Sequence, residues 1–166
     1  MIGLHALHGE RVSLLPFREA WANHYARWLA DPYVQRMAGE RPETPEQVCD
    51  RHRRWTQAPC FVEYIIIDRQ RALPIGDVSL NAAEPPPKFG IMIGEPAFRG
   101  RRFAAEAATL LLDYARAQGW MRIVAEVYDH NELSLRFHQK LGFRLLEHDA
   151  AGGQWVLERA LDACGP

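Results

Sequence analysis

The order of the predicted elements indicates a single α/β domain of the α+β type over residues 1–166. β-branched and aromatic runs predict about seven strands, and apolar residues at helical spacing predict about four helices. Three strand segments follow one another between residues 61 and 94, and a long helix then separates the third of them from the next strand. We therefore expect one mixed, mostly antiparallel and twisted sheet, with a central parallel pair joined by a right-handed crossover.

Residues 11–17 predict the first strand, and Pro16 places the end of this strand near a sheet edge. Residues 19–30 predict the first helix, because large apolar side chains recur on one helical face. These side chains are Trp21, Tyr25, Trp28 and Leu29. The pair Asp31-Pro32 ends this helix, since a proline disfavours helical backbone at the residue before it.

A second helix is predicted over residues 44–57 by its opening sequence Thr44-Pro45-Glu46-Gln47. The threonine is suited to the N-cap, the proline to the first helical position and the glutamine to the partner position of a capping box. Aromatic and β-branched residues then predict three strands, separated by polar or proline-rich turns, over residues 61–67, 75–80 and 88–94.

The last third of the chain alternates between helical and strand patterns. Glycines follow both predicted helices, as is typical of helix C-termini. The elements are a helix over 104–118, a strand over 121–128, a helix over 131–141, and strands over 143–147 and 154–161.

Charge and cysteine content exclude several classes of protein. Lys plus Arg is 20 and Asp plus Glu is 21, so a net charge of −1 argues against a surface that binds nucleic acid as a whole. No apolar run is long enough to span a membrane, and the N-terminus lacks the features of a secretory signal. Cys49, Cys60 and Cys164 are scattered, which predicts neither a disulfide framework nor a metal site. We expect a cytoplasmic protein without nucleic-acid or membrane partners.

Three arginines, Arg99, Arg101 and Arg102, stand at the predicted start of the helix over 104–118. Free backbone N–H groups at a helix N-terminus attract anions, and guanidinium groups strengthen binding of phosphate. Gly100 allows the backbone to approach a ligand closely. The alternative is a solvated basic turn.

A polar stripe formed by Asn131, Ser134 and His138 marks the helix over 131–141, where these residues have the spacing i, i+3 and i+7. It lies beside an apolar stripe, so the helix is suited to lining a ligand groove. The alternative is that Asn131 is only an N-cap and His138 only a half-exposed surface residue.

Together these two segments resemble the two motifs of the GNAT family of acetyl-CoA-dependent N-acetyltransferases. The first motif reads Arg99-Gly-Arg-Arg-Phe-Ala104, and the second reads Asn131-Glu-Leu-Ser134, then His138 and Lys140-Leu-Gly-Phe143. The predicted element order also matches the family over nearly the whole chain. Leu14-Leu-Pro-Phe17 and Pro74-Ile-Gly76 resemble the ribosomal-protein and polyamine acetyltransferase branches.

The resemblance implies how acetyl-CoA, the cosubstrate, binds without a metal. A β-bulge near Met92, Ile93 and Gly94 splays the central parallel pair, and the pantetheine arm enters the gap. The pyrophosphate lies on main-chain N–H groups of the first motif: Arg99, Gly100, Arg101, Arg102, Phe103 and Ala104. The polar stripe of the second motif, with Asn131, Ser134 and His138, holds the pantetheine.

This chain departs from the family pattern at two positions. Arg102 stands where the first motif has its central glycine, which puts tight packing around the pyrophosphate in question. His138 stands where many relatives have a tyrosine that protonates the leaving thiolate, so His138 is the candidate general acid. Glu63 is the candidate general base, and Asp77 and Glu95 are alternatives.

The implied reaction is direct attack of a primary amine on the thioester in a ternary complex. The acceptor is either a protein N-terminus or a small-molecule amine, and its site lies in the helices and loops before Cys60. Acidic residues in that region, Asp31, Glu40, Glu43 and Glu46, are too spread out in sequence to predict a polyamine site. The alternative function is a catalytically weak or inactive acyl-CoA-binding module, and a homodimer is compatible with both.

Overall fold

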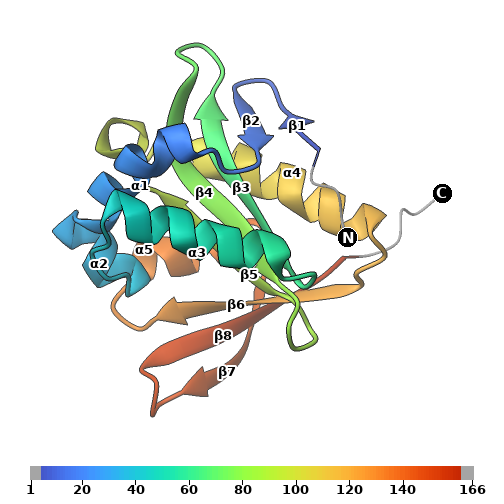
Figure 1. Cartoon of the computed structure of the whole chain (residues 1–166). Coiled ribbons are helices and arrows are strands. Elements are labelled where there is room, and N and C mark those ends of the chain that lie inside the picture. Colours follow the sequence, from blue (N-terminus) through green and yellow to red (C-terminus); the bar gives the residue numbers. More distant parts are fainter. Residues whose placement is uncertain (1–4, 162–166) are drawn as a thin grey trace.

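Residues 5–161, which the computed structural model describes, form eight strands in one sheet with the order β1-β2-β3-β4-β5-β6-β8-β7 (Figure 1). All described neighbours are antiparallel except β5 and β6. The strands are β1 (Leu7–His8), β2 (Val12–Leu15), β3 (Phe61–Asp68), β4 (Leu73–Asn81), β5 (Lys88–Ile93), β6 (Arg122–Tyr128), β7 (Arg144–Asp149) and β8 (Gln154–Ala160).

Helices cover both faces of this sheet (Figure 1). Over the same residues they are α1 (Ala22–Leu29), α2 (Pro32–Ala38), α3 (Pro45–Gln57), α4 (Phe103–Ala117) and α5 (Glu132–Lys140), with 3₁₀ turns η1 (Glu19–Trp21) and η2 (Pro96–Phe98). Strand β3 shows how the two layers are separated. Tyr64 and Ile66 pack in the core with α4, whereas Ile65 and Ile67 pack in the core with α1 and α3. Both faces of β3 are therefore buried, which explains its almost continuous apolar sequence.

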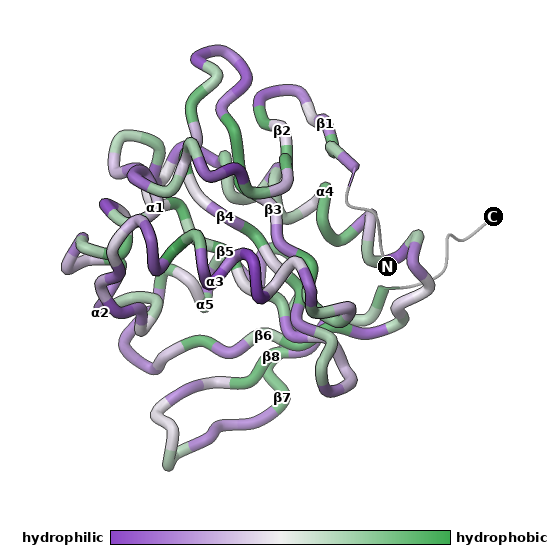
Figure 2. The backbone as a smooth tube through the Cα atoms, in the orientation of Figure 1, coloured by the Kyte–Doolittle hydropathy of each residue, from purple (hydrophilic) through white to green (hydrophobic). Residues whose placement is uncertain are grey.

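The hydropathy of the backbone follows this layered arrangement. Figure 2 shows hydrophobic residues along the central strands and much of α4, whereas α3 is hydrophilic over most of its length. Only two residues of α3, Val48 and His52, are buried. Helix α3 is thus an outer helix that presents a narrow inner edge to the sheet.

The seven predicted strands and four predicted helices are confirmed, and two further elements appear. The two-residue strand β1 is too short to leave a periodic pattern. Helix α2 was missed because Asp31-Pro32 ends α1 but also begins α2: Asp31 Oδ1 accepts a hydrogen bond from Tyr33 N at 2.9 Å and Pro32 takes the first helical position. The capping box of α3 is present as predicted.

Strands β5 and β6 separate almost as soon as they meet. Lys88 and Val124 are their one register pair in the described chain, after which β5 pairs only with β4 and β6 only with β8. The β4–β5 register is continuous from Lys88 to Ile93, so no register shift in that ladder accompanies the separation. The expected bulge is therefore absent at Met92 and Ile93, and the next hydrogen bond beyond this ladder runs from Glu95 N to Ile75 O at 3.0 Å, one residue out of register at Gly94. The gap begins where the β5–β6 pairing ends.

Gly94, at the end of β5, lies against the indole of Trp28. A Cβ atom at Gly94 would lie 2.2 Å from Trp28 Cγ, and Trp28 is only 1% exposed. We predict that Gly94→Ala lowers the free energy of unfolding by about 1–3 kcal/mol, because a buried indole must move. Denaturant unfolding followed by tryptophan fluorescence measures this loss.

Gly90→Ala, in the same strand, is the matched control. Its Cβ would meet only the Ser79 side chain, at 3.1 Å, so we expect a smaller loss. Equal losses in the two variants would show that contact with Trp28 is not the reason for glycine at position 94.

Candidate active site

A cleft of about 510 Å³ opens where β5 and β6 diverge. One wall is the unpaired edge of β5 from Phe89 to Ile93. The cleft is lined from the α2 side by Tyr33, Val34 and Met37, and from the other helical layer by residues of α4 and α5. Two ligands can therefore reach its middle from different helical layers.

Most of the residues predicted to bind acetyl-CoA share this cleft. Those that line it are Met92, Ile93, Arg99, Gly100, Ala104, Asn131, Ser134 and His138. Gly94 instead packs on Trp28. Arg101 and Phe103 line a separate hollow of about 640 Å³ with Arg11, Arg69 and Arg71, and Arg102 is exposed.

Tyr33 and Met37, which the sequence offers as apolar lining for the acceptor site, do line the cleft. Phe89, Glu40 and Tyr128 line it as well. Sequence reasoning missed these three as cleft residues, because no motif marks them. Tyr128 had one available signal, namely its position at the end of a strand that leads into the second motif.

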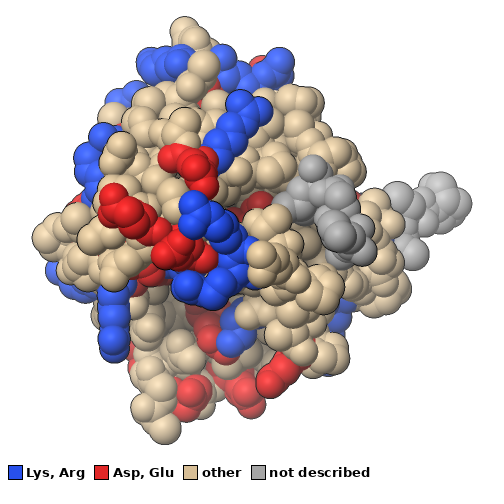
Figure 3. Space-filling view, in the orientation of Figure 1, with Lys and Arg blue, Asp and Glu red and all other residues tan. Residues whose placement is uncertain are grey.

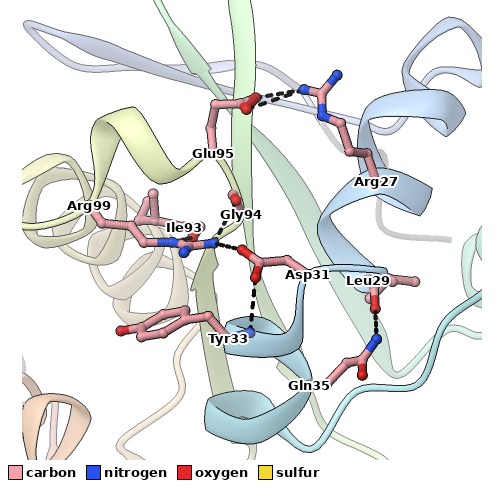
Figure 4. Close-up of polar contacts among 9 residues, drawn as sticks. All are labelled: Arg27, Leu29, Asp31, Tyr33, Gln35, Ile93, Gly94, Glu95 and Arg99. Carbon is pink, nitrogen blue, oxygen red and sulfur yellow. Dashed lines mark hydrogen bonds and ion pairs between the residues drawn. The ribbon is translucent and has the colours of Figure 1, made fainter.

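Arg99 fastens the end of β5 to the start of α2 (Figure 4). Its Nε donates to Ile93 O at 3.0 Å. Its Nη2 donates to Gly94 O at 2.8 Å and to Asp31 Oδ2 at 2.7 Å. The guanidinium carbon lies 4.4 Å from the centre of the Tyr33 ring. The Arg99 side chain is thus occupied by protein contacts, and its backbone N–H donates to Pro96 O at 3.2 Å.

Asp31 makes two contacts at this junction. Its Oδ1 caps α2, and its Oδ2 pairs with Arg99. The hydrogen bond from Arg99, followed by that from Tyr33 N, lowers the pKa of the Asp31 carboxyl. A carboxyl with a lowered folded-state pKa stabilises the fold above its unfolded pKa, and this contribution is lost as the pH falls through the folded value.

We predict that Asp31→Asn lowers the free energy of unfolding at pH 7 by about 1–2 kcal/mol, because asparagine keeps the helix cap but loses the charged partner of Arg99. The difference from wild type should disappear in acid, once Asp31 is protonated. Urea titrations at pH 7 and at pH 3 or below measure both effects. Asp113→Asn, which removes an exposed partner of Arg116, should cost much less; a loss that persists unchanged in acid would contradict the ion-pair explanation.

Arg102 adopts the backbone conformation that a glycine favours. Its φ is +66° and its ψ is 12°, in the left-handed region, immediately before α4 begins. A side chain in this region costs about 1–2 kcal/mol. The motif's central glycine is therefore explained by backbone geometry at the helix start, and this chain keeps that geometry with an arginine.

We predict that Arg102→Gly raises the free energy of unfolding by roughly 0.5–1 kcal/mol, after the larger flexibility of glycine in the unfolded chain is subtracted. Thermal and urea unfolding measure the gain. Arg101→Gly is the control, because no positive φ is present there and the extra flexibility should then lower stability. A destabilised Arg102→Gly protein would mean that the arginine side chain supports the loop.

His138 is buried on the α5 side of the cleft. It is 4% exposed and packs edge-on against Phe89, Phe137 and Phe143. Its Nδ1 lies 2.8 Å from Ser134 O, so Nδ1 carries a hydrogen and donates a hydrogen bond to that carbonyl. Burial lowers the pKa of His138, and the bond to Ser134 opposes this only in part. The neutral imidazole is therefore the resting form at pH 7.

Asn131 ties α5 to α2. Its Oδ1 accepts from Ser134 N at 3.1 Å as a helix cap, and its Nδ2 donates to Met37 O at 2.9 Å. The interpretation of Asn131 as an N-cap is confirmed. Asn131 also lines the cleft, so its role as a helix cap is compatible with its predicted place in the ligand groove.

Acidic residues that are far apart in sequence gather behind the cleft around α3. Arg51 Nη1 lies 3.3 Å from Glu43 Oε1 and 3.6 Å from Glu40 Oε2, and its side chain is 12% exposed. Figure 3 shows acidic and basic side chains side by side on the face that carries α3. The expectation that the carboxylates of this region are too dispersed to cluster is thus corrected for Glu40 and Glu43 alone, because both meet Arg51, whereas Asp31 pairs with Arg99.

Asp77, on β4, pairs with Met92 and lines the cleft, as Glu40 does. It is 9% exposed, and its Oδ1 is buried without a hydrogen-bond partner among the described residues. Burial raises the pKa of Asp77 well above its usual range, and the charges of Glu63 and Glu40 raise it further. Glu63 is not among the residues that line the cleft, and its Oε2 lies 2.8 Å from His52 Nε2. Glu95 Oε2 pairs with Arg27 Nη2 at 2.7 Å.

A family model described as an acetyltransferase (GNAT) domain matches residues 11–144. This chain belongs to the GNAT family and is an N-acetyltransferase that uses acetyl-CoA. It is 28% identical over 153 residues to the human alpha/beta-tubulin-N-acetyltransferase 9, with 82% of this chain and 74% of that protein covered. It is 27% identical over 152 residues to an N-acetyltransferase 9-like protein of Nematostella vectensis, with 83% and 77% covered.

Solved structures share the fold at low identity. A spermidine N-acetyltransferase from Vibrio cholerae in complex with CoA and spermine has a TM-score of 0.81 at 17% identity, covering 92% of this chain and 97% of that chain. A ribosomal-protein-S5-alanine acetyltransferase from Vibrio fischeri has a TM-score of 0.79 at 17% identity, covering 98% and 100%. Both branches that the sequence resembles are thus represented among the structural neighbours.

Within residues 5–161, His, Cys, Asp and Glu side chains form no group of three that could hold a metal ion. No helix in that range is long and apolar enough to cross a membrane. Cys49 and Cys60 are free thiols, and Cys164 lies outside the described residues.

Proposed function

We propose that the cleft between β5 and β6 is where the acceptor amine attacks acetyl-CoA directly in a ternary complex. The observation that carries this proposal is the divergence of β5 and β6 after Lys88 and Val124, with a buried carboxylate, Asp77, lining the gap. The free edge of β5 offers backbone groups to a pantetheine amide chain, as an added strand would. The cleft residues present therefore fit an extended acyl-CoA arm.

The first motif supports phosphate binding mainly through its backbone. Gly100 has a φ of +70° and nothing within 4 Å of a Cβ position, so the loop at the start of α4 is open to a ligand. Helix α4 is 15 residues long and directs its free N–H groups and positive dipole end at this loop. The residues proposed to cradle the pyrophosphate are Arg99, Gly100, Arg101, Arg102, Phe103 and Ala104.

Asp77 is the residue best placed to accept the proton of the acceptor ammonium. It reaches the cleft directly, whereas Glu63 lies behind it against His52. A raised pKa makes Asp77 a stronger base when it is ionised, and the approach of an ammonium group favours that ionised form. Glu63 then contributes to general-base catalysis from behind Asp77 and does not itself contact the amine.

His138 is the proposed proton donor to the CoA thiolate. Its Nδ1–H is engaged by Ser134 O, so Nε2 is the atom that takes up the second N–H proton, lost as the attacking nitrogen becomes the amide, and passes it to the thiolate. Burial disfavours the imidazolium and so makes it a stronger acid once it forms. Formation of a thiolate nearby supplies the negative charge that favours this cation.

The acceptor is a primary amine, either a protein N-terminus or a small molecule. The α2 side of the cleft is apolar and aromatic, with Tyr33, Val34 and Met37, and Glu40 and Asp77 supply carboxylates further in. This arrangement fits an ammonium group carried on an apolar or peptide chain. The human relative is named for tubulin and the Vibrio cholerae neighbour was solved with spermine, so tubulin and spermine are two acceptors to test.

We further propose that residues 1–166 work as one cytoplasmic domain and form a homodimer through β7. This strand is a sheet edge in which all six residues are exposed, including Leu145 at 48% and Leu146 at 54%. An unpaired edge that exposes two leucines among charged residues is suited to pairing with a second copy. Light scattering in solution tests the dimer.

The function is tested by thiol release from acetyl-CoA with a panel of peptide N-termini and small amines. Thermal protection by acetyl-CoA is measured in parallel. Protection together with turnover supports the enzyme. Protection without turnover on any amine supports the alternative, an inactive acyl-CoA-binding module, which the arginine at position 102 and the histidine at position 138 favour. Absence of protection contradicts both.

We predict that Asp77→Asn lowers kcat about 10²–10⁴-fold, because the amide cannot accept the proton, while acetyl-CoA still protects the protein thermally. Wild-type kcat should rise with pH through the raised pKa of Asp77, and this rise should be absent from the variant. A pH series of kcat on the best amine measures both effects. Ser79→Ala, on the same strand and also lining the cleft, is the control; a variant at position 77 that keeps the wild-type pH profile would exclude Asp77 as the base.

A further inference from the structure

Two carboxylates line the cleft, and they come from separate parts of the chain. Asp77 lies on β4, and Glu40 lies in the connection between α2 and α3. Asp77 is 9% exposed, and its Oδ1 has no hydrogen-bond donor among the described residues. A buried carboxylate oxygen without a donor is costly, so a ligand that brings an N–H donor to this part of the cleft is favoured.

Glu40 shares its basic partner with a second carboxylate. Arg51 Nη1 lies 3.6 Å from Glu40 Oε2 and 3.3 Å from Glu43 Oε1. The guanidinium carbon of Arg51 lies 5.0 Å and 4.8 Å from the ring centres of Tyr25 and Trp55, so these rings hold it beside the two carboxylates. Glu40 lines the cleft and Glu43 does not. One guanidinium therefore serves two carboxylates, and one of the two also faces a ligand.

Glu63 has a basic partner of its own in His52. Nδ1 of His52 lies 2.8 Å from Val48 O, so it carries a hydrogen and donates a hydrogen bond to that carbonyl. Nε2 lies 2.8 Å from Glu63 Oε2, although the contact is not aligned as a hydrogen bond. Two lone pairs cannot face each other at this distance, so one proton lies on the nitrogen or on the oxygen. With either placement the pair has no net charge.

The remaining charges leave a surplus of two negative charges beside the cleft. Glu40, Glu43 and Asp77 supply three carboxylates when ionised, and Arg51 supplies one guanidinium. Among the described residues, no second Lys or Arg forms an ion pair with any of the three. Burial raises the pKa of Glu40 and of Asp77, and the charge of Glu40 contributes to the shift at Asp77. Such carboxylates are stabilised in their ionised form by cations that a ligand brings.

We propose that the acceptor of this enzyme carries two positive charges, and that Glu40 binds the second charge while Asp77 receives the amine that is acetylated. The inference rests on the proposed function and makes its substrate class narrower. One ammonium group neutralises half of the surplus charge, whereas a dication neutralises all of it. Each contact is stronger than it would be in water, because protein encloses part of the cleft.

The spacer between the two charges lies against apolar side chains. Tyr33, Val34 and Met37, shortly before Glu40 in the sequence, line the α2 side of the cleft. An aliphatic spacer fits such a surface, because its contact with these side chains removes apolar area from water. Two classes of amine share this chemistry: a diamine or polyamine, and a peptide whose N-terminal residue is followed by a basic side chain. A monoamine lacks the group that Glu40 binds.

The test compares matched acceptors with the full-length enzyme. The first arm sets straight-chain α,ω-diamines of increasing length against monoamines of the same length. The second arm sets short peptides with arginine at the second position against the same peptides with citrulline, which has the same shape without the charge. We expect kcat/KM to be at least about tenfold higher for the dication in at least one arm. A preference in the first arm alone identifies small diamines, and one in the second arm alone identifies basic N-termini.

Glu40→Gln and its matched control Glu43→Gln separate a contact in the cleft from a change of total charge. Both variants remove one negative charge from the partners of Arg51, but only the first changes a residue that lines the cleft. We expect Glu40→Gln to reduce the dication preference at least about tenfold, mainly through a higher KM for the dication. Its kcat/KM for monoamines, and the dication preference of Glu43→Gln, should change less than about threefold. Thermal unfolding checks that both variants are folded.

Calorimetry with CoA in place of acetyl-CoA measures binding of the same amines without acetyl transfer. We expect tighter binding of the dication together with release of protons from the protein, because cations lower the raised pKa of Glu40 and Asp77. Titrations in two buffers of different ionisation enthalpy measure this release. Equal binding of dications and monoamines, a preference that Glu40→Gln keeps, or one that Glu43→Gln abolishes to the same extent overturns the inference. Absence of turnover with every amine overturns the proposed function instead, and calorimetry still decides the dication preference.

Discussion

The structure depends on one feature, the loss of pairing between β5 and β6 after Lys88 and Val124. Two strands that diverge within a sheet expose backbone donors and acceptors that would otherwise be satisfied by each other, and such groups need partners when they are buried. Their neighbours β4 and β8 keep each strand in place, because both outer ladders are continuous over the diverging residues. The sheet is therefore rigid on both sides of a gap whose edges are suited to an extended ligand.

Arg99 shows how the fold keeps this gap open at its far end. A strand that loses a neighbour also leaves its terminal carbonyls without partners, and Arg99 supplies donors to Ile93 O and Gly94 O. The same guanidinium pairs with Asp31, so the end of β5 and the start of α2 move as one unit. The first position of the family motif is thus used here for structure, while the proposed binding of phosphate by the loop relies on its backbone and the α4 N-terminus.

Periodicity, caps and turns in the sequence predict nearly all of the fold, because these signals are local. The capping box at Thr44 and the apolar run of β3 are clear examples. The acid cluster could not be predicted in this way. Glu63 and Asp77 lie on the paired strands β3 and β4, and the fold of the α2–α3 connection over the sheet brings Glu43 to the same side. Likewise, no local pattern shows that β5 leaves β6 after a single pair, although the family resemblance indicates that a gap is present.

The same distinction explains the two departures from the family pattern. Arg102 is a local departure, since the left-handed backbone required there is tolerated by an arginine at a modest energetic cost. His138 is a change of environment as well as of residue, because three phenylalanine rings and Ser134 O determine its protonation. A buried neutral imidazole on one side of the cleft and a buried carboxylate with a raised pKa on the other are groups whose proton affinities have been moved toward each other. The proposed proton transfer between an attacking amine and a leaving thiolate uses such a pair, and in this chain the environment of each residue shifts its proton affinity more than the residue type does.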